Sequence, residues 1–291
     1  CPSFISNYNM AKIHHYSNTF YPRLEEITGQ PAGWHGCGGI RLATTQEEVD
    51  WFKHVAGYSA NVGFHMEIIG PARIKELNPW LETDGILAGA YTNMDGHVDP
   101  SSACNAMAAG ARQLGATIIR RTRVTDIKVL PSGEFEVVTD AGNITCEHVV
   151  NAAGCYAREV GKWVGVDTPI TNMEHQYLVT EKSDLVPDNL PALRDPDGNY
   201  YVKPEPGALA IGGWESQTRT VDAQHGFAWQ NERFLFDSNL ERLEEFFAPA
   251  LKRLPILNSL GIRTIINGPI PISPDGEPVM GPAPGFANFY A

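Results

Sequence analysis

One short string limits the fold of this chain more than any other. His148-Val149-Val150-Asn151 predicts a strand, Ala152-Ala153-Gly154 predicts a turn of small residues, and residues 156–164 predict a helix. A strand, a tight turn and a helix in this order bring backbone N–H groups to a helix N-terminus, where an anionic part of a cofactor can bind. Taken alone, the string fits an ordinary packed turn equally well. The sequence motifs around it are needed to distinguish a cofactor-binding turn from a structural one.

Helix and strand patterns alternate on both sides of this string, and the pattern changes after residue 168. Strand signals separated by proline-rich segments then indicate antiparallel pairing. The sequence therefore predicts an α/β (α+β) fold, with a discontinuous α/β part interleaved with an antiparallel part. The predicted helices cover residues 9–27, 45–60, 71–77, 99–114, 156–164 and 231–248. The predicted strands cover 38–43, 64–69, 86–91, 118–119, 124–129, 135–138, 148–151, 173–180, 200–205, 209–214 and 262–267, and a rigid loop is predicted over 268–276.

Composition excludes several classes of protein. The chain has 291 residues and a net charge of -12, which does not suit a nucleic-acid backbone. Its five cysteines are scattered and form no C-x-x-C pair, which argues against a zinc or thioredoxin-type motif and favours a reducing compartment. No long apolar run predicts a membrane span. The opening at Cys1 and the strand-like end at residue 291 are expected to be truncations of a longer chain.

Three other groups of residues are better explained by structure than by chemistry. The fingerprint G-x-G-x-x-G is absent, and Gly36-Cys37-Gly38-Gly39 is expected to be a turn that enters a strand. In the turn Asp95-Gly96-His97-Val98-Asp99, both aspartates are expected to be structural, with Asp99 starting a helix, and no metal site is predicted. Trp214 either lines a pocket or packs in the core.

Five strings occur in a fixed order along the chain: Gly39-Ile40-Arg41-Leu42-Ala43-Thr44-Thr45, Asp95-Gly96-His97-Val98-Asp99-Pro100, Asn151-Ala152-Ala153-Gly154, Glu174-His175-Gln176-Tyr177, and Asn267-Gly268-Pro269 with Ser273-Pro274-Asp275. In this series the chain resembles the D-amino-acid-oxidase-like flavoproteins, in particular the dimethylglycine and sarcosine dehydrogenase branch. The resemblance covers essentially the whole chain. It implies a discontinuous, Rossmann-like FAD-binding domain interleaved with an antiparallel substrate domain.

The resemblance also implies a division of the chain. Residues 1–70 are expected to continue an FAD and substrate domain after a missing G-x-G-x-x-G unit, and 71–167 to be mainly FAD-binding. Residues 168–260 are expected to form the substrate domain, and 261–291 to return to the FAD-binding domain. The histidine that carries the flavin covalently is expected upstream of residue 1. His14 and His15, inside a predicted helix, are therefore not the attachment site.

The family's flavin contacts map onto a few positions of this sequence. The resemblance implies that Val124 meets the adenine side, that Ala153, Gly154 and Tyr156 lie along the flavin, and that Gly268 and Pro269 approach its ring. Many relatives have Trp or Phe near this turn, where this chain has Cys155-Tyr156. These contacts alone bury too little of FAD to hold it.

Two residues resemble the family's catalytic groups. His175 is expected on a strand, on the same face as Tyr177, where the resemblance places it over the flavin; a structural histidine is the alternative. Tyr200 and Tyr201 point to opposite faces of their strand, and Tyr201 matches the family position better. A substrate carboxylate requires a cation, for which Arg41, Arg194 and Lys203 are all candidates.

The resemblance implies oxidative demethylation of an N-methyl amino acid such as dimethylglycine or sarcosine, with hydride transfer to FAD. Tetrahydrofolate is an expected acceptor of the one-carbon unit if a C-terminal domain exists, and an electron-transfer flavoprotein is an expected partner. The mitochondrial matrix or the cytoplasm is the expected compartment. The alternative is a flavin-free, non-catalytic subunit or scaffold that retains the fold.

Overall fold

The computed structural model describes residues 1–5, 7–187, 189–221, 229 and 235–291. These residues form two compact units. Unit 1 comprises Cys1–Ile118, Gln176–Ser216 and Ser238–Ile266, and unit 2 comprises Ile119–His175, Gln217–Asp237 and Asn267–Ala291. Two strands, β8 (Thr171–Thr180) and β12 (Ile262–Ile272), contribute residues to both units. Among the helices described, none combines the length and the apolar character that a membrane crossing requires.

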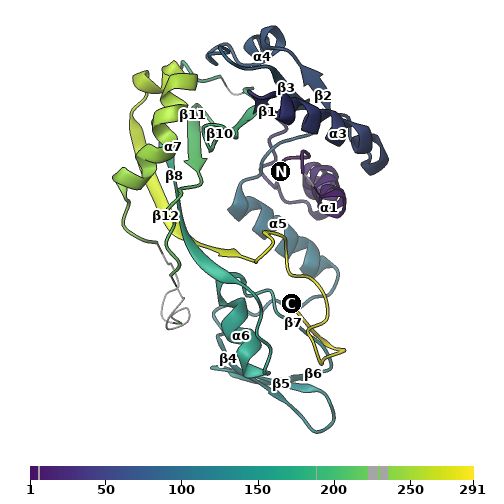
Figure 1. The fold of residues 1–291 in the computed structure, drawn as a ribbon. Coiled ribbons are helices and arrows are strands. Elements are labelled where there is room, and N and C mark those ends of the chain that lie inside the picture. Colours follow the sequence, from purple (N-terminus) through teal and green to yellow (C-terminus); the bar gives the residue numbers. More distant parts are fainter. Residues whose placement is uncertain (6, 188, 222–228, 230–234) are drawn as a thin grey trace. The chain divides into compact units, whose positions relative to one another are not determined.

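A mixed sheet forms the centre of unit 1 (Figure 1). Its strand order is β12-β8-β11-β10-β9-β1-β3-β2. All strand pairs with a described register are antiparallel except β1 and β9, which run parallel. The strands that lie wholly in unit 1 are β1 (Gly39–Ala43), β2 (Glu67–Ile69), β3 (Ala88–Thr92), β9 (Ala192–Asp195), β10 (Tyr200–Glu205) and β11 (Ala208–Gly213).

Local sequence signals set the helix boundaries of unit 1. Thr45 and Glu48 form a capping box at the start of α3, and Gly63 ends that helix in the left-handed conformation. Asp99 caps α5 through the backbone N–H of Ser102, and proline follows it at the first helical position. The helices are α1 (Tyr8–Phe20), η1 (Tyr21–Arg23), α2 (Leu24–Thr28), α3 (Gln46–Val62), α4 (Pro71–Leu77), α5 (Pro100–Gln113), α7 (Leu240–Arg253) and η3 (Pro255–Ser259).

The main core of unit 1 lies between one sheet face and helix α7. Phe246 on α7 is fully buried, and Tyr200 and Ile211 contribute to the same core from β10 and β11. A second core lies beneath α3, around Phe52 and Val55. The sheet face opposite α7 is therefore left to line a cavity, described below.

Unit 2 combines a three-stranded antiparallel meander with a parallel strand pair and a short helix (Figure 1). Phe135 and Phe289 are fully buried at its centre. The elements are β4 (Val124–Val129), β5 (Phe135–Thr139), β6 (Gly142–Cys146), β7 (Val149–Val150), η2 (Gly154–Tyr156), α6 (Ala157–Trp163) and β13 (Phe289–Tyr290). Strand β7, the turn at Gly154 and α6 confirm the predicted strand-turn-helix string.

The mixed fold class is confirmed, and several element predictions are wrong in detail. Residues 268–272 continue β12 instead of starting a loop, because their backbone pairs in the sheet despite two prolines. Residues 118–119 form no strand. The turn residues at 140–143 predict a break between strands, yet the last two of them already belong to β6, which covers Gly142–Cys146. The last helix begins after Asn239, whose side chain caps it, and not at 231. Residues 231–234 of that prediction lie outside the described residues.

The small residues of α5 pack against a helix and not against the sheet. Gly110 faces Thr28 so closely that an added Cβ would lie 2.8 Å from the threonine methyl group. Ala106 is buried against Leu24 of α2. Small side chains allow two helices to approach each other as readily as they allow a helix to approach a sheet.

Candidate functional site

A cavity of about 170 Å³ lies on the sheet face of unit 1 opposite α7. Its size matches an internal cavity that takes a ligand of benzene's size, about 150 Å³. Strands β1, β9 and β10 contribute most of its polar lining. The lining includes Arg41, Thr92, Asp95, His97, Arg194, Tyr201 and Lys203.

Strand register brings three polar side chains into one row. Arg41 on β1 is opposite Arg194 on β9, and Arg194 is opposite Tyr201 on β10. Residues directly opposite each other project from the same sheet face, on strands about 4.8 Å apart. The row therefore brings two guanidinium groups and one phenol into the same cavity from segments far apart in the sequence.

The two arginines are close enough to affect each other's charge. Burial lowers the pKa of Arg41, and the neighbouring Arg194 lowers it further. Arg194 is exposed to solvent on the cavity face, and the partial loss of its hydration lowers its pKa, against the attraction of Asp95. Both guanidinium groups stay charged at neutral pH. Among the described residues neither one has a hydrogen bond or an ion pair.

The other titratable groups of the cavity have different electrostatic environments. Lys203 is paired with Glu205, with 2.5 Å between Nζ and Oε1. Burial, with Lys203 and His35 nearby, lowers the pKa of His97 to about 4, so this imidazole is neutral at pH 7. Burial raises the pKa of Asp95 to about 6, although its carboxylate accepts a hydrogen bond from the backbone N–H of Ser3. Among the side chains that the structure describes, the positive charge of the cavity without an ion pair therefore comes from its two arginines.

The adjacent tyrosines of β10 have opposite environments, as the strand geometry predicts. Tyr200 is buried in the core and donates a hydrogen bond to Asp195 Oδ2 over 3.0 Å. Tyr201 lies on the cavity face, where its ring covers Gly212 of β11 so closely that a Cβ there would overlap the phenol. Burial raises the pKa of Tyr201, so its hydroxyl keeps its proton at neutral pH.

Unit 2 has a larger cavity, of about 740 Å³, with a mainly apolar and aromatic lining. Trp229 stacks between Tyr156 and Trp163, with ring centroids 5.1 and 5.0 Å apart. Arg123 lies over the same indole ring. Of the predicted flavin contacts, Val124, Ala153 and Tyr156 line this cavity.

The turn beside this cavity has room for a ligand. Gly154 has a φ of +56°, and an added Cβ would meet no atom within 4 Å. Asn151 fixes the turn, since its side chain donates to Ala157 O over 2.8 Å. Cys155 Sγ lies 3.7 Å from Pro269 O, which links this turn to the Gly268-Pro269 segment of β12. A cavity of this size, with stacked rings and an open glycine, fits a flat aromatic cofactor.

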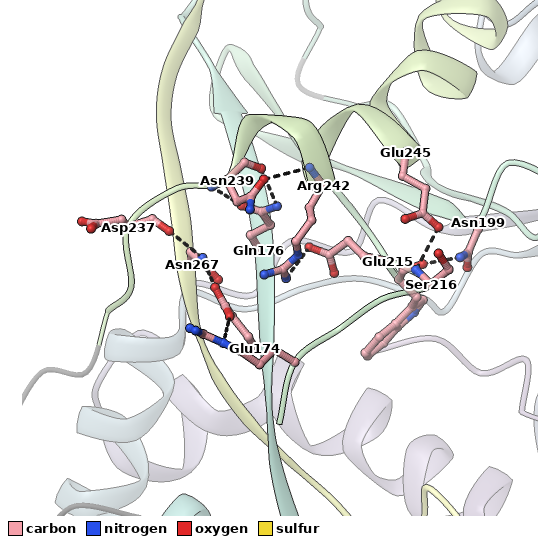
Figure 2. A network of polar contacts seen from close by, with 12 residues as sticks. Glu174, Gln176, Asn199, Glu215, Ser216, Asp237, Asn239, Arg242, Glu245 and Asn267 are labelled. Carbon is pink, nitrogen blue, oxygen red and sulfur yellow. Dashed lines mark hydrogen bonds and ion pairs between the residues drawn. The ribbon is translucent and has the colours of Figure 1, made fainter. Parts of the chain in front are cut away.

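His175 is half-buried on β8, between two buried polar residues that face the other way. Tyr177 shares its face, as predicted. Glu174 accepts a hydrogen bond from Asn267 Nδ2 over 2.7 Å (Figure 2). It also accepts one from Arg219 Nε over 3.0 Å. In unit 1, Gln176 bonds to the backbone of Asn239 in both directions (Figure 2). Both neighbours of His175 are thus anchored, which holds the backbone of β8 at this residue.

The remaining candidates have structural surroundings. His14 and His15 lie inside α1, and Asp99 caps α5. Trp214 is 52% exposed, so it does not pack in the core, and it does not line the unit 1 cavity. Residues 36–38 have no regular secondary structure and lead into β1, and Gly38 N donates a hydrogen bond to Asp95 O over 2.8 Å.

For several residues that line the two cavities, no sequence pattern indicated their role. Trp163 and Trp229 lie far apart along the chain, and nothing in the string around Gly154 indicates that they stack. Arg123 likewise gave no signal. The pairing of Arg41 with Arg194 depends on parallel register between distant strands, which periodicity alone does not reveal.

Comparison with known proteins agrees with this architecture. The family described as FAD dependent oxidoreductase matches residues 2–291. The chain belongs to this family of flavoenzymes.

Individual relatives narrow the comparison. The chain is 42% identical over 289 residues to mitochondrial dimethylglycine dehydrogenase of Rattus norvegicus, covering 97% of this chain and 34% of that protein. It is 31% identical to mitochondrial sarcosine dehydrogenase of Homo sapiens, covering 98% and 31%. It is 30% identical to the mitochondrial pyruvate dehydrogenase phosphatase regulatory subunit of Mus musculus, covering 96% and 32%. The chain spans about a third of the length of these relatives.

Solved structures share the fold. L-proline dehydrogenase from P. horikoshii superposes with a TM-score of 0.86 at 22% identity, covering all of this chain and 74% of that one. At this identity the likeness supports the fold and not the substrate.

Proposed function

We propose that this chain is part of a flavoenzyme that oxidatively demethylates an N-methyl amino acid such as dimethylglycine or sarcosine. One observation carries the proposal: a small cavity in unit 1 combines a protonated tyrosine with two arginines that form no ion pair with any described residue. An N-methyl amino acid has a carboxylate and an amine, and these groups complement that lining. The relatives named dimethylglycine and sarcosine dehydrogenase support the same substrate class.

The proposed roles follow the residue environments. Tyr201, protonated at neutral pH, hydrogen-bonds the substrate amine and favours its neutral form. His175, held by its anchored neighbours, is the proposed acceptor of the amine proton. In unit 2, Val124, Ala153, Gly154, Tyr156, Gly268 and Pro269 are the proposed cofactor contacts. FAD, when bound, supplies the acceptor for the hydride of the N-methyl carbon.

Further features of the proposal rest on the family resemblance. They are covalent attachment of the flavin to a histidine upstream of residue 1, tetrahydrofolate as the one-carbon acceptor, and electron transfer to an electron-transfer flavoprotein. The mitochondrial matrix is the proposed compartment, because the dimethylglycine and sarcosine dehydrogenases above are named as mitochondrial.

A second candidate function is a non-catalytic regulatory subunit that retains the fold. The similarity to the phosphatase regulatory subunit favours it, since that relative matches over nearly the whole chain. The two candidates differ in flavin content and in turnover.

The test uses the full-length protein. It is precipitated with acid, and visible absorbance of pellet and supernatant is recorded; turnover is then measured with dimethylglycine, sarcosine and proline. Flavin in the pellet together with demethylation supports the proposed enzyme and its covalent cofactor. Flavin without turnover of any N-methyl amino acid contradicts the proposed substrate class, and absence of flavin from both fractions favours the regulatory subunit.

A further inference from the structure

Unit 1 has another cavity, which adjoins the sheet-face cavity described above. Three loop or strand-end segments line it, namely 33–35 before β1, 97–100 at the start of α5, and 203–206 at the end of β10. This loop cavity has a volume of about 520 Å³, against about 170 Å³ for the sheet-face cavity. His97 and Lys203 line both of them, so the two cavities share a wall.

The lining of the loop cavity suits the passage of a ligand better than its retention. A tryptophan ring and three prolines make the lining mainly apolar. Every charged side chain among the described residues that line it is engaged. Lys203 pairs with Glu205, and Asp99 Oδ1 accepts a hydrogen bond from Ser102 N. Burial lowers the pKa of His97 to about 4, so its imidazole is neutral at pH 7. A small charged ligand therefore meets no free counter-charge there, in contrast to the sheet-face cavity.

The shared wall has a fixed part and a movable part. The backbone of His97 is bonded twice to His35, over 3.0 Å from its N–H and 2.8 Å to its carbonyl oxygen. Lys203 has a long flexible side chain, and its only printed restraint is the ion pair with Glu205. Both members of that pair are about a third exposed, and such pairs contribute little to stability. Lys203 can therefore move at low energetic cost, whereas the backbone of His97 cannot.

We propose that a small ligand reaches the sheet-face cavity through the loop cavity, and that Lys203 is the movable part of the wall between them. The ion pair with Glu205 holds the lysine in the wall, and a swing of its side chain away from that wall opens the passage. Lys203 then controls the rate at which the ligand enters and has no part in the chemical step.

Only the identity of the ligand rests on the proposed function. If that function holds, the ligand is a short N-methyl amino acid. The passage itself is a property of the two cavities and their shared wall, so it can be tested without turnover.

The first test measures access to the sheet-face cavity in the full-length holoenzyme. Cys1 lines this cavity, and methyl methanethiosulfonate, a small neutral thiol reagent, is the probe. Peptide mass spectrometry follows its reaction at Cys1 and at the exposed Cys104, which serves as an internal control. Val98→Trp fills the loop cavity, and we expect it to slow the reaction of Cys1 about fivefold or more. Lys203→Ala shortens the movable side chain, and we expect it to speed that reaction about threefold or more. The matched control is Lys53→Ala, which removes an ion-paired lysine that lines neither cavity and should change nothing.

Neither expected change can come from a trivial cause. Local unfolding would expose Cys1 and speed its reaction, so it cannot imitate the fall in Val98→Trp. Loss of a nearby positive charge raises the pKa of a thiol and slows its reaction, so it cannot imitate the rise in Lys203→Ala. Lys203→Arg keeps the charge and the length of the side chain, and we expect it to restore the parental rate with an unchanged unfolding midpoint.

Three outcomes would overturn the proposal. An unchanged Cys1 rate in Val98→Trp would show that small molecules enter by another route. An unchanged rate in Lys203→Ala, or an equal rise in Lys53→Ala, would show that this lysine does not limit access.

A second test measures flavin reduction after rapid mixing with dimethylglycine. In Val98→Trp we expect the apparent second-order rate constant at low substrate concentration to fall about fivefold, with the limiting rate at saturation unchanged. A fall of the limiting rate alone would place the loop cavity in the chemical step and overturn the passage. If no N-methyl amino acid reduces the flavin, the proposed function is refuted, while the altered Cys1 rates would still establish the passage.

Discussion

The two faces of the unit 1 sheet differ although they share the same strands. On the face toward α7, Tyr200 and Gly213 pack in a core around Phe246. On the other face, Tyr201 lines a cavity that also contains two arginines, and its ring covers Gly212. Identical residue types, one position apart, thus serve stability on one face and recognition on the other. Paired substitutions at these neighbours test that difference directly.

The glycine pair should give the largest contrast. At Gly213 an added Cβ would overlap Phe246 and lie 2.6 Å from Asn199 O, in a core that cannot relax. We expect Gly213→Ala to lower the free energy of unfolding by about 3 kcal/mol. At Gly212 the obstacle is the Tyr201 ring, which borders the cavity and can rotate away, so Gly212→Ala should cost less than about 1 kcal/mol. Urea denaturation measures both values.

For catalytic activity we expect the opposite order, with the larger loss in Gly212→Ala and the smaller loss in Gly213→Ala. Displacement of Tyr201 in Gly212→Ala should reduce kcat/KM for the amine substrate, whereas Gly213→Ala, assayed well below its unfolding midpoint, should keep it. If both variants lose stability equally, the cavity face is packed like the core and the contrast fails.

The next effect concerns Asp95 on the cavity face. Burial raises its pKa from 3.8 to about 6, so the folded state binds the proton more tightly than the unfolded state does. The native state then loses stability as pH rises from about 4 to about 6. A difference of about two pKa units corresponds to about 3 kcal/mol. Asp95→Asn removes this titration and can still accept the bond from Ser3 N.

We therefore expect the stability of Asp95→Asn relative to the parent to improve by about 2 kcal/mol between pH 4 and pH 7. Urea denaturation at several pH values measures it. A difference that does not vary with pH would show that Asp95 has an ordinary pKa.

The tyrosine pair gives a smaller effect on stability. Tyr200→Phe removes the donor to buried Asp195, whose remaining donors among the described residues are Arg253 Nε at 3.4 Å and Gly198 N at 3.3 Å. The expected loss is about 1.5 kcal/mol. Tyr201→Phe should leave the unfolding midpoint unchanged and lower kcat. Thermal unfolding and steady-state kinetics measure the two effects on both variants. A catalytic defect confined to Tyr200→Phe would contradict a structural role for Tyr200 and a catalytic role for Tyr201.

The smallest effects separate the paired and unpaired cations of the cavity face. Lys203 and Glu205 are each about a third exposed, so loss of this ion pair in Lys203→Met should cost less than about 1 kcal/mol. Arg194→Met removes a charge that lacks an ion pair among the described residues and sits opposite Arg41. Its unfolding midpoint should stay the same or rise. A clear loss of stability would reveal a counter-ion that compensates Arg194.

Sequence reasoning succeeded where a local signal carries the structure. Alternation along residues 200–205 gave β10 with its correct bounds and placed its two tyrosines on opposite faces. Capping residues Thr45 and Asp99 marked the starts of α3 and α5. The five ordered strings identified the family that the comparison confirms.

Sequence reasoning failed where the structure depends on an interaction between segments that are far apart in the sequence. Proline argued against a strand at residues 268–272, yet pairing in the sheet prevails there. Three cations were equal candidates for a carboxylate until register joined Arg41 to Arg194 and an ion pair engaged Lys203. The roles of His175, Tyr201 and the cofactor contacts remain predictions that the variants above address.

The segmented make-up of the two units has a consequence for how the chain acquires its structure. Unit 1 needs residues from three separated stretches, and the last of them ends at Ile266; unit 2 is completed only by the stretch that follows. During synthesis on the ribosome neither unit can be completed early. Strand β1 meets its first partner, β3, at residues 88–92, but its second partner, β9, begins only at Ala192. Pairings between such remote segments fold slowly. If the chain is divided into two fragments at a single point, neither fragment therefore contains a complete unit that could fold alone. Refolding of the whole chain should be slow and prone to aggregation.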